Sequence, residues 1–217
     1  MRQTRRFVVI LLIFVVVAGA VSLRSAEEKE DLVFAESLDL TAAVVDGKEI
    51  TLADMAFYIA YEEGEIEKKA YIYNMKDTGE YWKLFSHYVF LRKEGKDAAM
   101  DMAVHDTIFY ELALEEGIVL DEEEELRLAN SQYDFWSDLE EEQREALGVG
   151  EDVIKESMRR LAVAEKYQYV LAAMEGKSAA SYSVGGSAYE ELLTEHTCEI
   201  RKDVWNRIRF GGITVNH

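Results

Sequence analysis

The sequence predicts a mainly α-helical fold with small β elements formed by an N-terminal hairpin and C-terminal strands. Apolar residues recur at helical spacing over several long segments, which is typical of helices that bury one face. Asp46-Gly47 lies between short apolar runs, as in a two-residue hairpin turn. The 217 residues include no proline, which excludes a Pro-rich linker, a collagen-like repeat or a polyproline ligand and fits a helical body joined by Gly- and Asp-based turns.

The chain is strongly acidic, with 24 basic and 43 acidic residues and a net charge of −19. Nucleic acids and anionic lipids bind basic surfaces, so a general affinity for either is not expected. Cys198 is the one cysteine, which excludes an intrachain disulfide framework and a cysteine-based zinc cluster. Because 49% of the residues are hydrophobic, the chain can bury a core and global disorder is not expected.

Residues 1–25 have the pattern of an export signal. Three arginines precede an apolar run over residues 7–20, and no acidic residue occurs before Glu27. The small residues at 18–20 fit a cleavage site, which predicts a signal peptide. The 17 residues of 7–23 also reach the low end of the ~17–25 that span a bilayer, which fits a signal anchor. Both readings predict an extracytoplasmic protein, secreted or anchored to the outer face of the cytoplasmic membrane, with membrane contact only through residues 7–23.

Residues 26–41 are polar and are interpreted as a spacer before a single domain over residues 42–216. That domain begins with the expected hairpin over residues 42–51. Thr51 then has the pattern of a helix N-cap, because Asp54 lies three residues later as its capping-box partner. A helix is therefore expected to begin directly after the hairpin.

Four further helices are expected along the chain. Asp121 with Glu124 forms a second capping-box pattern, and the acidic residues that follow Asp121 favour the positive end of a helix dipole. Glycines mark the ends of three of these helices, and the helix that begins at Asp121 is expected to break near Asp138. The expected ranges are about 96–116, 121–138, 139–147 and 151–175. In the second of these, the side chains expected to face the core are Leu126, Ala129, Tyr133 and Trp136.

The C-terminal part begins with a Gly/Ser-rich stretch at 176–187, which is typical of a loop. A short helix carrying Tyr189 follows, and strand-like runs lie at 198–200 and 208–215. Short strands at opposite ends of a helical chain are expected to pair with each other. Such pairing would close the helical body into one domain.

No catalytic, cofactor-binding or metal-binding residue is assigned from the sequence. The histidines form no HExxH or HxH pattern, and His105 is interpreted as a surface or core histidine. Cys198 with His196 could form a nucleophile and its base, but no third orienting group accompanies them. The acidic run at 121–125 lacks the spacing and the central glycine of a calcium loop.

Residues 71–90 are unusually aromatic, with seven aromatic side chains among 20 residues against 11% in the whole chain. These side chains either pack in the core or form a partly exposed lip that holds apolar segments of other polypeptides. Because the surroundings are acidic, such a lip is expected to bind apolar, neutral or basic segments and to repel acidic ones. The candidate peptide-binding residues are Tyr81, Phe85 and Tyr88, expected on one helical face, and the adjacent Trp82.

The order of these features resembles the SurA/PrsA group of extracytoplasmic foldases. An export signal and a spacer precede VVDGKEIT, and DMAVHDTIFYELALEEGIVLDEEEE follows at residues 101–125. The ending DVWNRIRFGGITVN, residues 203–216, resembles the C-terminal return segment that completes the chaperone domain in some of these proteins. The resemblance covers about residues 42–175 and implies the N-terminal chaperone domain of that group.

The chain departs from that group at residues 176–187, where relatives usually carry a parvulin-type isomerase domain. A compact domain needs on the order of a hundred residues, and here a loop and a short helix occupy this place. The resemblance implies an exported, ATP-independent chaperone that binds unfolded or extended segments of secreted proteins. The alternatives are a diverged peptidyl-prolyl isomerase and a non-catalytic cell-surface adaptor that binds one fixed partner.

Overall fold

The computed structural model describes residues 30–86 and 89–217, and the expected export signal lies outside these residues. Contacts divide the chain into two units, residues 1–31 and 32–217, and the second unit contains all the elements described below. Within the described residues, no helix is long and apolar enough to cross a membrane.

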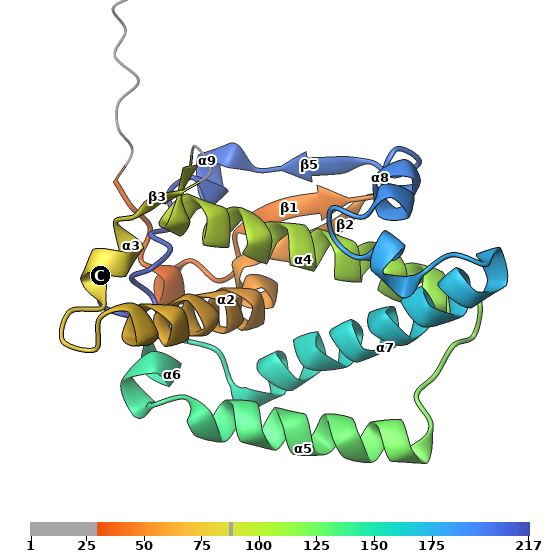
Figure 1. The fold of residues 1–217 in the computed structure, drawn as a ribbon, viewed down its shortest axis with the longest axis horizontal. Coiled ribbons are helices and arrows are strands. Elements are labelled where there is room, and N and C mark those ends of the chain that lie inside the picture. Colours follow the sequence, from red (N-terminus) through yellow and green to blue (C-terminus); the bar gives the residue numbers. More distant parts are fainter. Residues whose placement is uncertain (1–29, 87–88) are drawn as a thin grey trace, which may run out of the picture. The chain divides into compact units, whose positions relative to one another are not determined.

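A small antiparallel sheet joins the two ends of the second unit (Figure 1). Its central strand, β1 (Thr41–Val45), pairs on one side with β2 (Lys48–Thr51) and on the other with β5 (Cys198–Ile200). In the register, Val45 lies opposite both Lys48 and Cys198. The expected pairing of the N-terminal hairpin with the C-terminal strand at 198–200 is confirmed.

The hairpin turn also holds β5 in place. Asp46 and Gly47 have φ values of 47° and 82°, as a two-residue turn with positive φ at both positions requires. The Asp46 carboxylate accepts hydrogen bonds from the Thr197 backbone N–H at 2.7 Å and lies 2.6 Å from Nδ1 of His196. The Thr197 N–H and the His196 ring lower the pKa of Asp46, because both favour the ionised carboxylate.

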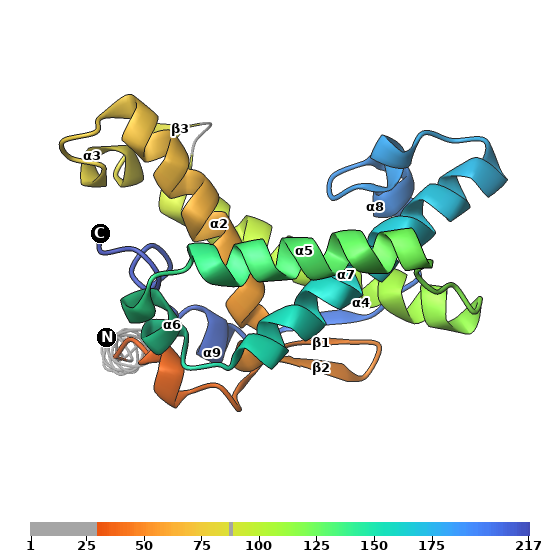
Figure 2. The same cartoon turned by 90° about the horizontal axis from the view of Figure 1, so that it is seen from below.

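Long helices form the body of the fold, and both α2 and α4 contact the sheet. In Figure 1 the sheet lies above α4, whereas α2 and α7 lie below it and α5 lies furthest from the sheet. Figure 2, viewed from below, shows α5 crossing in front of α2 and α7. The long helices and the short α6 are α2 (Leu52–Tyr73), α4 (Leu91–Glu115), α5 (Glu122–Asp138), α6 (Glu141–Leu147) and α7 (Glu151–Glu175).

The expected helix caps are present. Thr51 and Asp54 exchange the two hydrogen bonds of a capping box at the start of α2, and Asp121 and Glu124 do the same for α5. Each capping box pairs backbone N–H groups that a helix start would otherwise leave without a partner. Gly176 ends α7 with a φ of 65°, a conformation that favours glycine.

Short elements fill the connections. Two of them, η2 and α8, lie in and after the Gly/Ser-rich stretch, where Tyr182 and Tyr189 are buried. This stretch is therefore packed on the fold. The short elements are η1 (Phe34–Glu36), α3 (Gly79–Trp82), β3 (Phe85–Ser86), β4 (Val89–Phe90), η2 (Ala179–Tyr182), α8 (Ser187–Leu193) and α9 (Lys202–Trp205).

Two boundaries differ from those expected. The C-terminal part of the expected spacer belongs to the folded unit, because Phe34 is buried in the core and the Leu32 N–H donates to the Arg207 carbonyl at 2.9 Å. The helix expected from about residue 96 already begins at Leu91. The first turn of this helix contains charged residues, which obscure the apolar pattern of the sequence. Gly95 follows in the second turn, where the absence of a side chain allows close packing against Phe210.

The face of α5 that was expected to be buried is wrong in part. Leu126 and Tyr133 are 63% and 68% exposed, and Ala129 is exposed as well. Trp136 is half-buried, and Leu128 is the buried residue of this helix. The reason is that α5 packs mainly against one neighbour, α7. A helix covered on one side leaves part of its apolar surface in water.

The strand expected over residues 208–215 is also absent, and a buried carboxylate explains why. Glu63 of α2 is fully buried and accepts hydrogen bonds from the backbone N–H groups of Gly211, Ile213 and Thr214 at 2.5, 3.4 and 2.6 Å. Its fourth donor is the Thr214 hydroxyl at 2.6 Å. These N–H groups bind one side chain, so they are not available to the edge of a sheet.

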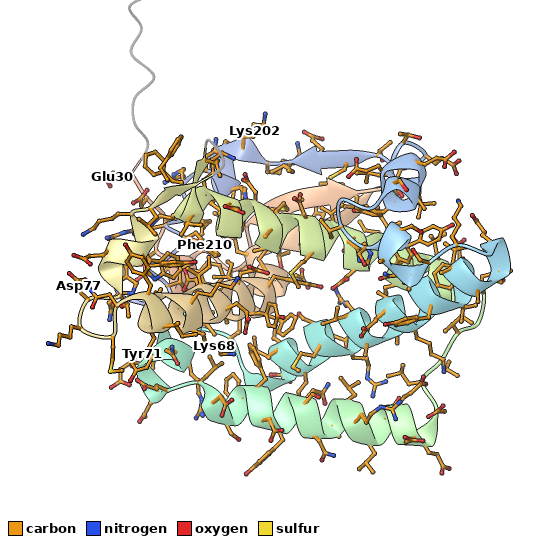
Figure 3. All side chains as sticks on the ribbon, viewed as in Figure 1. Glu30, Lys68, Tyr71, Asp77, Lys202 and Phe210 are labelled. Atoms are coloured by element: carbon orange, nitrogen blue, oxygen red, sulfur yellow. The ribbon has the colours of Figure 1, made fainter. Side chains whose placement is uncertain are left out.

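Glu63 thereby attaches residues 210–214 to α2. Figure 3 shows Phe210 inside the fold, whereas Lys68 and Tyr71 of α2 lie at its surface. Burial raises the pKa of Glu63, and the hydrogen bonds from Thr214, Gly211 and Ile213 oppose that rise. All four partners donate, which is the arrangement that an ionised, acceptor-only carboxylate needs.

Substituting Glu63→Gln is expected to destabilise the protein by about 1–3 kcal/mol. The glutamine amide replaces one acceptor oxygen by an NH₂ group, so the buried donors that faced this oxygen lose their acceptor. The free energy of unfolding in urea measures the effect. Glu65→Gln is the control, since Glu65 pairs with Lys68 at the surface and should change stability by less than about 0.5 kcal/mol. Equal stability of the two variants would contradict this role for Glu63.

Candidate peptide-binding cavity

A cavity of about 780 Å³ lies beside α3, β4, the first turns of α4 and residues 205–217. The apolar part of its wall is mainly aromatic. Trp82 and Phe210 are 2% and 1% exposed and form buried parts of the wall, whereas Phe90 is 57% exposed. The apolar lining residues are Trp82, Phe90, Trp205, Ile208 and Phe210.

Trp82 is fixed from three sides. Its indole Nε1–H donates to Glu67 of α2 at 2.7 Å, and its ring lies 6.2 Å from that of Phe210. Gly211 has a φ of +79°, and a Cβ at this position would lie 2.8 Å from Cζ3 of Trp82. The backbone conformation and the close approach therefore both require glycine at position 211.

Glu67 of α2 links Trp82, in the aromatic wall, to His217. It accepts from Trp82 and lies 2.8 Å from Nε2 of His217, which is also 3.1 Å from the Thr78 hydroxyl. Burial acts to raise the pKa of Glu67, but the hydrogen bonds from Trp82, Thr78 and His217 outweigh burial and lower it. Glu63 lies one helical turn earlier, so successive turns of α2 hold residues 210–217 through two carboxylates.

The polar part of the wall is mainly basic. Arg92 donates to the backbone oxygen of His217 at 2.9 Å, and Lys96 donates to the carbonyl of Ile208 at 2.7 Å while its Nζ lies 5.3 Å from the Trp205 ring centre. Lys93 pairs with Asp97 within α4. The basic lining residues are Lys83, Arg92, Lys93, Lys96 and Arg209.

The structure separates the residues expected to form one aromatic lip. Trp82 lines the cavity but is buried, Tyr81 is half-buried beside Tyr73 at 5.5 Å, and Phe85 is exposed. The expected shared helical face is wrong, because α3 ends at Trp82 and Phe85 begins strand β3. The fourth candidate, Tyr88, lies outside the described residues.

Sequence reasoning missed most of the wall. Phe90 is the last of the seven aromatic side chains in residues 71–90, but it was not among the candidate binding residues; it packs against Phe85 at 5.1 Å. The other missed apolar residues lie in WNRIRF, residues 205–210, where apolar side chains are interspersed with Arg207 and Arg209. That pattern is a signal for a surface that is both apolar and basic, although it also fits a strand with one buried face.

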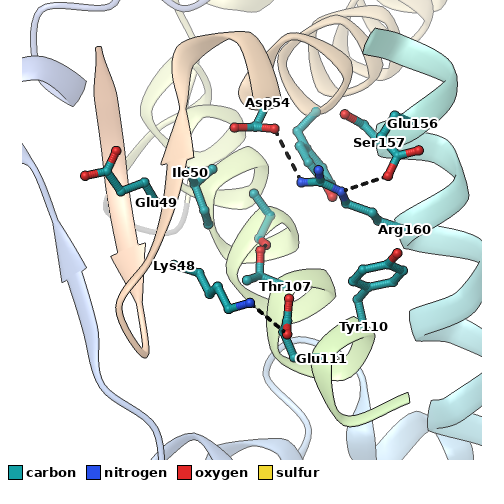
Figure 4. Close-up of a pocket in the computed structure, with 12 residues that line it drawn as sticks. Lys48, Glu49, Ile50, Asp54, Thr107, Tyr110, Glu111, Glu156, Ser157 and Arg160 are labelled. Atoms are coloured by element: carbon teal, nitrogen blue, oxygen red, sulfur yellow. Dashed lines mark hydrogen bonds and ion pairs between the residues drawn. The ribbon is translucent and has the colours of Figure 1, made fainter. Parts of the chain in front are cut away.

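A second pocket, of about 280 Å³, lies between the hairpin, α2, α4 and α7 (Figure 4). Its charged side chains bind one another: Arg160 lies 3.3 Å from Asp54 and 3.4 Å from Glu156, and Lys48 lies 3.2 Å from Glu111. A sixth charged side chain of the lining, Glu49, accepts a hydrogen bond from the Thr41 hydroxyl at 3.2 Å. Among the described residues, no group of three or more His, Cys, Asp or Glu side chains could hold a metal ion.

Buried polar groups behind this pocket satisfy one another. The Tyr58 hydroxyl donates to Asp106 at 3.1 Å, and Asp106 lies 2.9 Å from Nδ1 of His105, whose Nε2 lies 2.9 Å from the Tyr182 carbonyl oxygen. Burial raises the pKa of Asp106, and His105 and Tyr58 oppose this rise. Because both ring nitrogens of His105 have partners, this is a core histidine.

In the possible pair of Cys198 and His196, the histidine has an orienting partner that the sequence did not reveal, but the thiol is not activated. Nδ1 of His196 lies 2.6 Å from the Asp46 carboxylate at the hairpin turn. Burial, with the charges of Asp101 and Asp46, raises the pKa of the Cys198 thiol. A raised pKa disfavours the thiolate that a catalytic cysteine needs.

Comparison with models of known protein families, with curated proteins and with solved structures finds no match for this chain. The resemblance to the SurA/PrsA group therefore stays a prediction from the sequence. Fold and site together define a mainly helical domain with an aromatic cavity and a basic rim.

Trp82 and Phe85 are expected to respond differently to truncation. Trp82→Ala removes a buried ring and should destabilise the protein by about 3–5 kcal/mol. Phe85→Ala removes an exposed ring and should cost less than about 1 kcal/mol. Urea unfolding of both variants measures the difference, and similar losses would show that Phe85 is also part of the core.

The lowered pKa of Glu67 predicts how the free energy of unfolding changes at acidic pH. A carboxyl group whose pKa is lower in the folded state stabilises the fold above its unfolded pKa, and this contribution disappears as the pH falls through the folded pKa. The unfolded value is about 4.3. Stability measured from pH 6 to pH 3 should therefore fall more steeply in the unmodified chain than in Glu67→Gln. Parallel pH profiles would contradict the assignment.

Proposed function

We propose that this chain binds extended, apolar segments of other polypeptides without using a nucleotide, as a chaperone-like module. The observation that carries the proposal is the aromatic cavity of about 780 Å³. A volume between roughly 300 and 1,000 Å³ suits a small organic ligand, and a few side chains of an extended peptide occupy comparable space.

Aromatic walls suit this task because they offer large apolar area with little side-chain entropy to lose. Burial of apolar area contributes about 25 cal/mol per Å², and loss of translational freedom and ordering of the peptide offset most of this. One cavity of this size therefore supports weak binding. Weak, reversible binding is what a protein that holds unfolded segments and releases them requires.

The exposed ring of Phe90 supplies the cleanest test of the proposal. Phe90→Ala should reduce the ability of the full chain to suppress aggregation of several unrelated unfolded proteins, because it removes an exposed part of the cavity wall. Its urea stability should stay near that of the unmodified chain. Light scattering during dilution from denaturant measures the suppression.

Tyr133→Ala is the matched control, since Tyr133 is an exposed aromatic residue on α5 (68% against 57% for Phe90) that does not line the cavity. Equal suppression by both variants would overturn the role of the cavity. No suppression by the unmodified chain would favour an adaptor with one fixed partner. Catalytic acceleration of proline-limited refolding, which takes tens to hundreds of seconds without a catalyst, would favour an isomerase.

A further inference from the structure

We infer that the cavity selects apolar segments that carry carboxylates beside their apolar side chains, an inference that rests on the proposed function. The whole chain has 24 basic and 43 acidic residues, whereas the cavity lining reverses this balance. Five basic side chains line it, and among the lining residues that the structure describes, Asp97 alone is acidic. The local charge is thus opposite in sign to the net charge.

The basic side chains converge on the cavity from three elements. Arg92, Lys93 and Lys96 come from the first turns of α4, Lys83 follows α3, and Arg209 precedes the buried Phe210. Hydrogen bonds to the C-terminal segment hold three of these groups: Arg92 and Arg209 donate to the backbone oxygen of His217, and Lys96 donates to Ile208. They are therefore placed before any ligand arrives, which reduces the ordering cost of binding.

These basic side chains line the same cavity as aromatic rings, which strengthens their attraction for a carboxylate of the ligand. Charges interact more strongly beside a low-dielectric wall than in bulk water. Phe90 is the exposed aromatic side chain of the lining, and a ligand whose apolar side chain packs on it would bring a neighbouring carboxylate close to the basic lining residues. The expectation from net charge, that acidic segments are repelled, applies to the outer surface, whereas the rim attracts them at short range.

A polyanion such as single-stranded nucleic acid is the main competing ligand for an aromatic and basic surface. Binding along an extended polyanion would bring many phosphates close to a chain of net charge −19, which opposes association. A short peptide with two or three carboxylates meets the basic rim without extending across the acidic surface. The charge distribution therefore favours the acidic, apolar peptide.

The test uses three labelled peptides with the same Leu and Phe positions and with Glu, Gln or Lys at the remaining positions. Fluorescence anisotropy with the full chain measures each Kd at about 50 mM and 500 mM salt. The Glu peptide is expected to bind about five- to tenfold more tightly than the Gln peptide at low salt. The difference should shrink at high salt, because exposed charges are screened.

Charge-neutralising variants locate the effect. Lys83→Gln with Lys93→Gln should remove most of the preference for the Glu peptide, since both side chains are exposed at the rim. Lys68→Gln with Lys155→Gln is the control, because it makes the same change in net charge at surface lysines that pair with Glu65 and Glu151. Loss of the preference in both double variants would overturn the assignment to the cavity.

The outcomes separate this inference from the proposed function. Equal Kd values for the Glu and Gln peptides, both weakened by Phe90→Ala, would overturn the inference and leave the binding function in place. Failure of all three peptides to bind would overturn the proposed function itself. Tighter binding of a short single-stranded oligonucleotide than of the Glu peptide would also overturn the inference.

Discussion

The buried carboxylate of Glu63 is the interaction on which the C-terminal part of the structure depends. A carboxylate loses much favourable hydration when it leaves water, and only good hydrogen bonds offset that loss. Glu63 receives four of them from residues 211–214. Breaking this arrangement would destabilise the fold in two ways, because both the carboxylate and its donors would stay buried without hydrogen-bond partners.

The cavity follows from this attachment. Beyond α9 the chain forms no regular helix or strand within the described residues, so the backbone N–H groups of this segment need partners elsewhere. Glu63 supplies them, and Phe210 is thereby placed against Trp82, which Glu67 holds from the next turn of α2. The aromatic wall and its basic residues thus come together through two glutamates of one helix.

Local patterns predicted much of the fold. Thr51 with Asp54, Asp121 with Glu124 and the turn at Asp46-Gly47 each specify their conformation within a few residues, and all three are present. The cavity could not be predicted in this way, because Trp82 and Phe210 are brought together over more than a hundred residues by tertiary contacts. Glu63 shows no signal in the sequence, since a buried glutamate on a helix resembles its exposed neighbours.

Hydrogen exchange of the backbone N–H groups of Gly211, Ile213 and Thr214 tests the central claim most directly. NMR on the full chain can follow each of these N–H groups separately. If Glu63 binds them in a buried site, they should exchange far more slowly than in an unstructured peptide, although they belong to no helix or strand. Exchange at the unprotected rate would contradict the claim that Glu63 attaches this segment to α2.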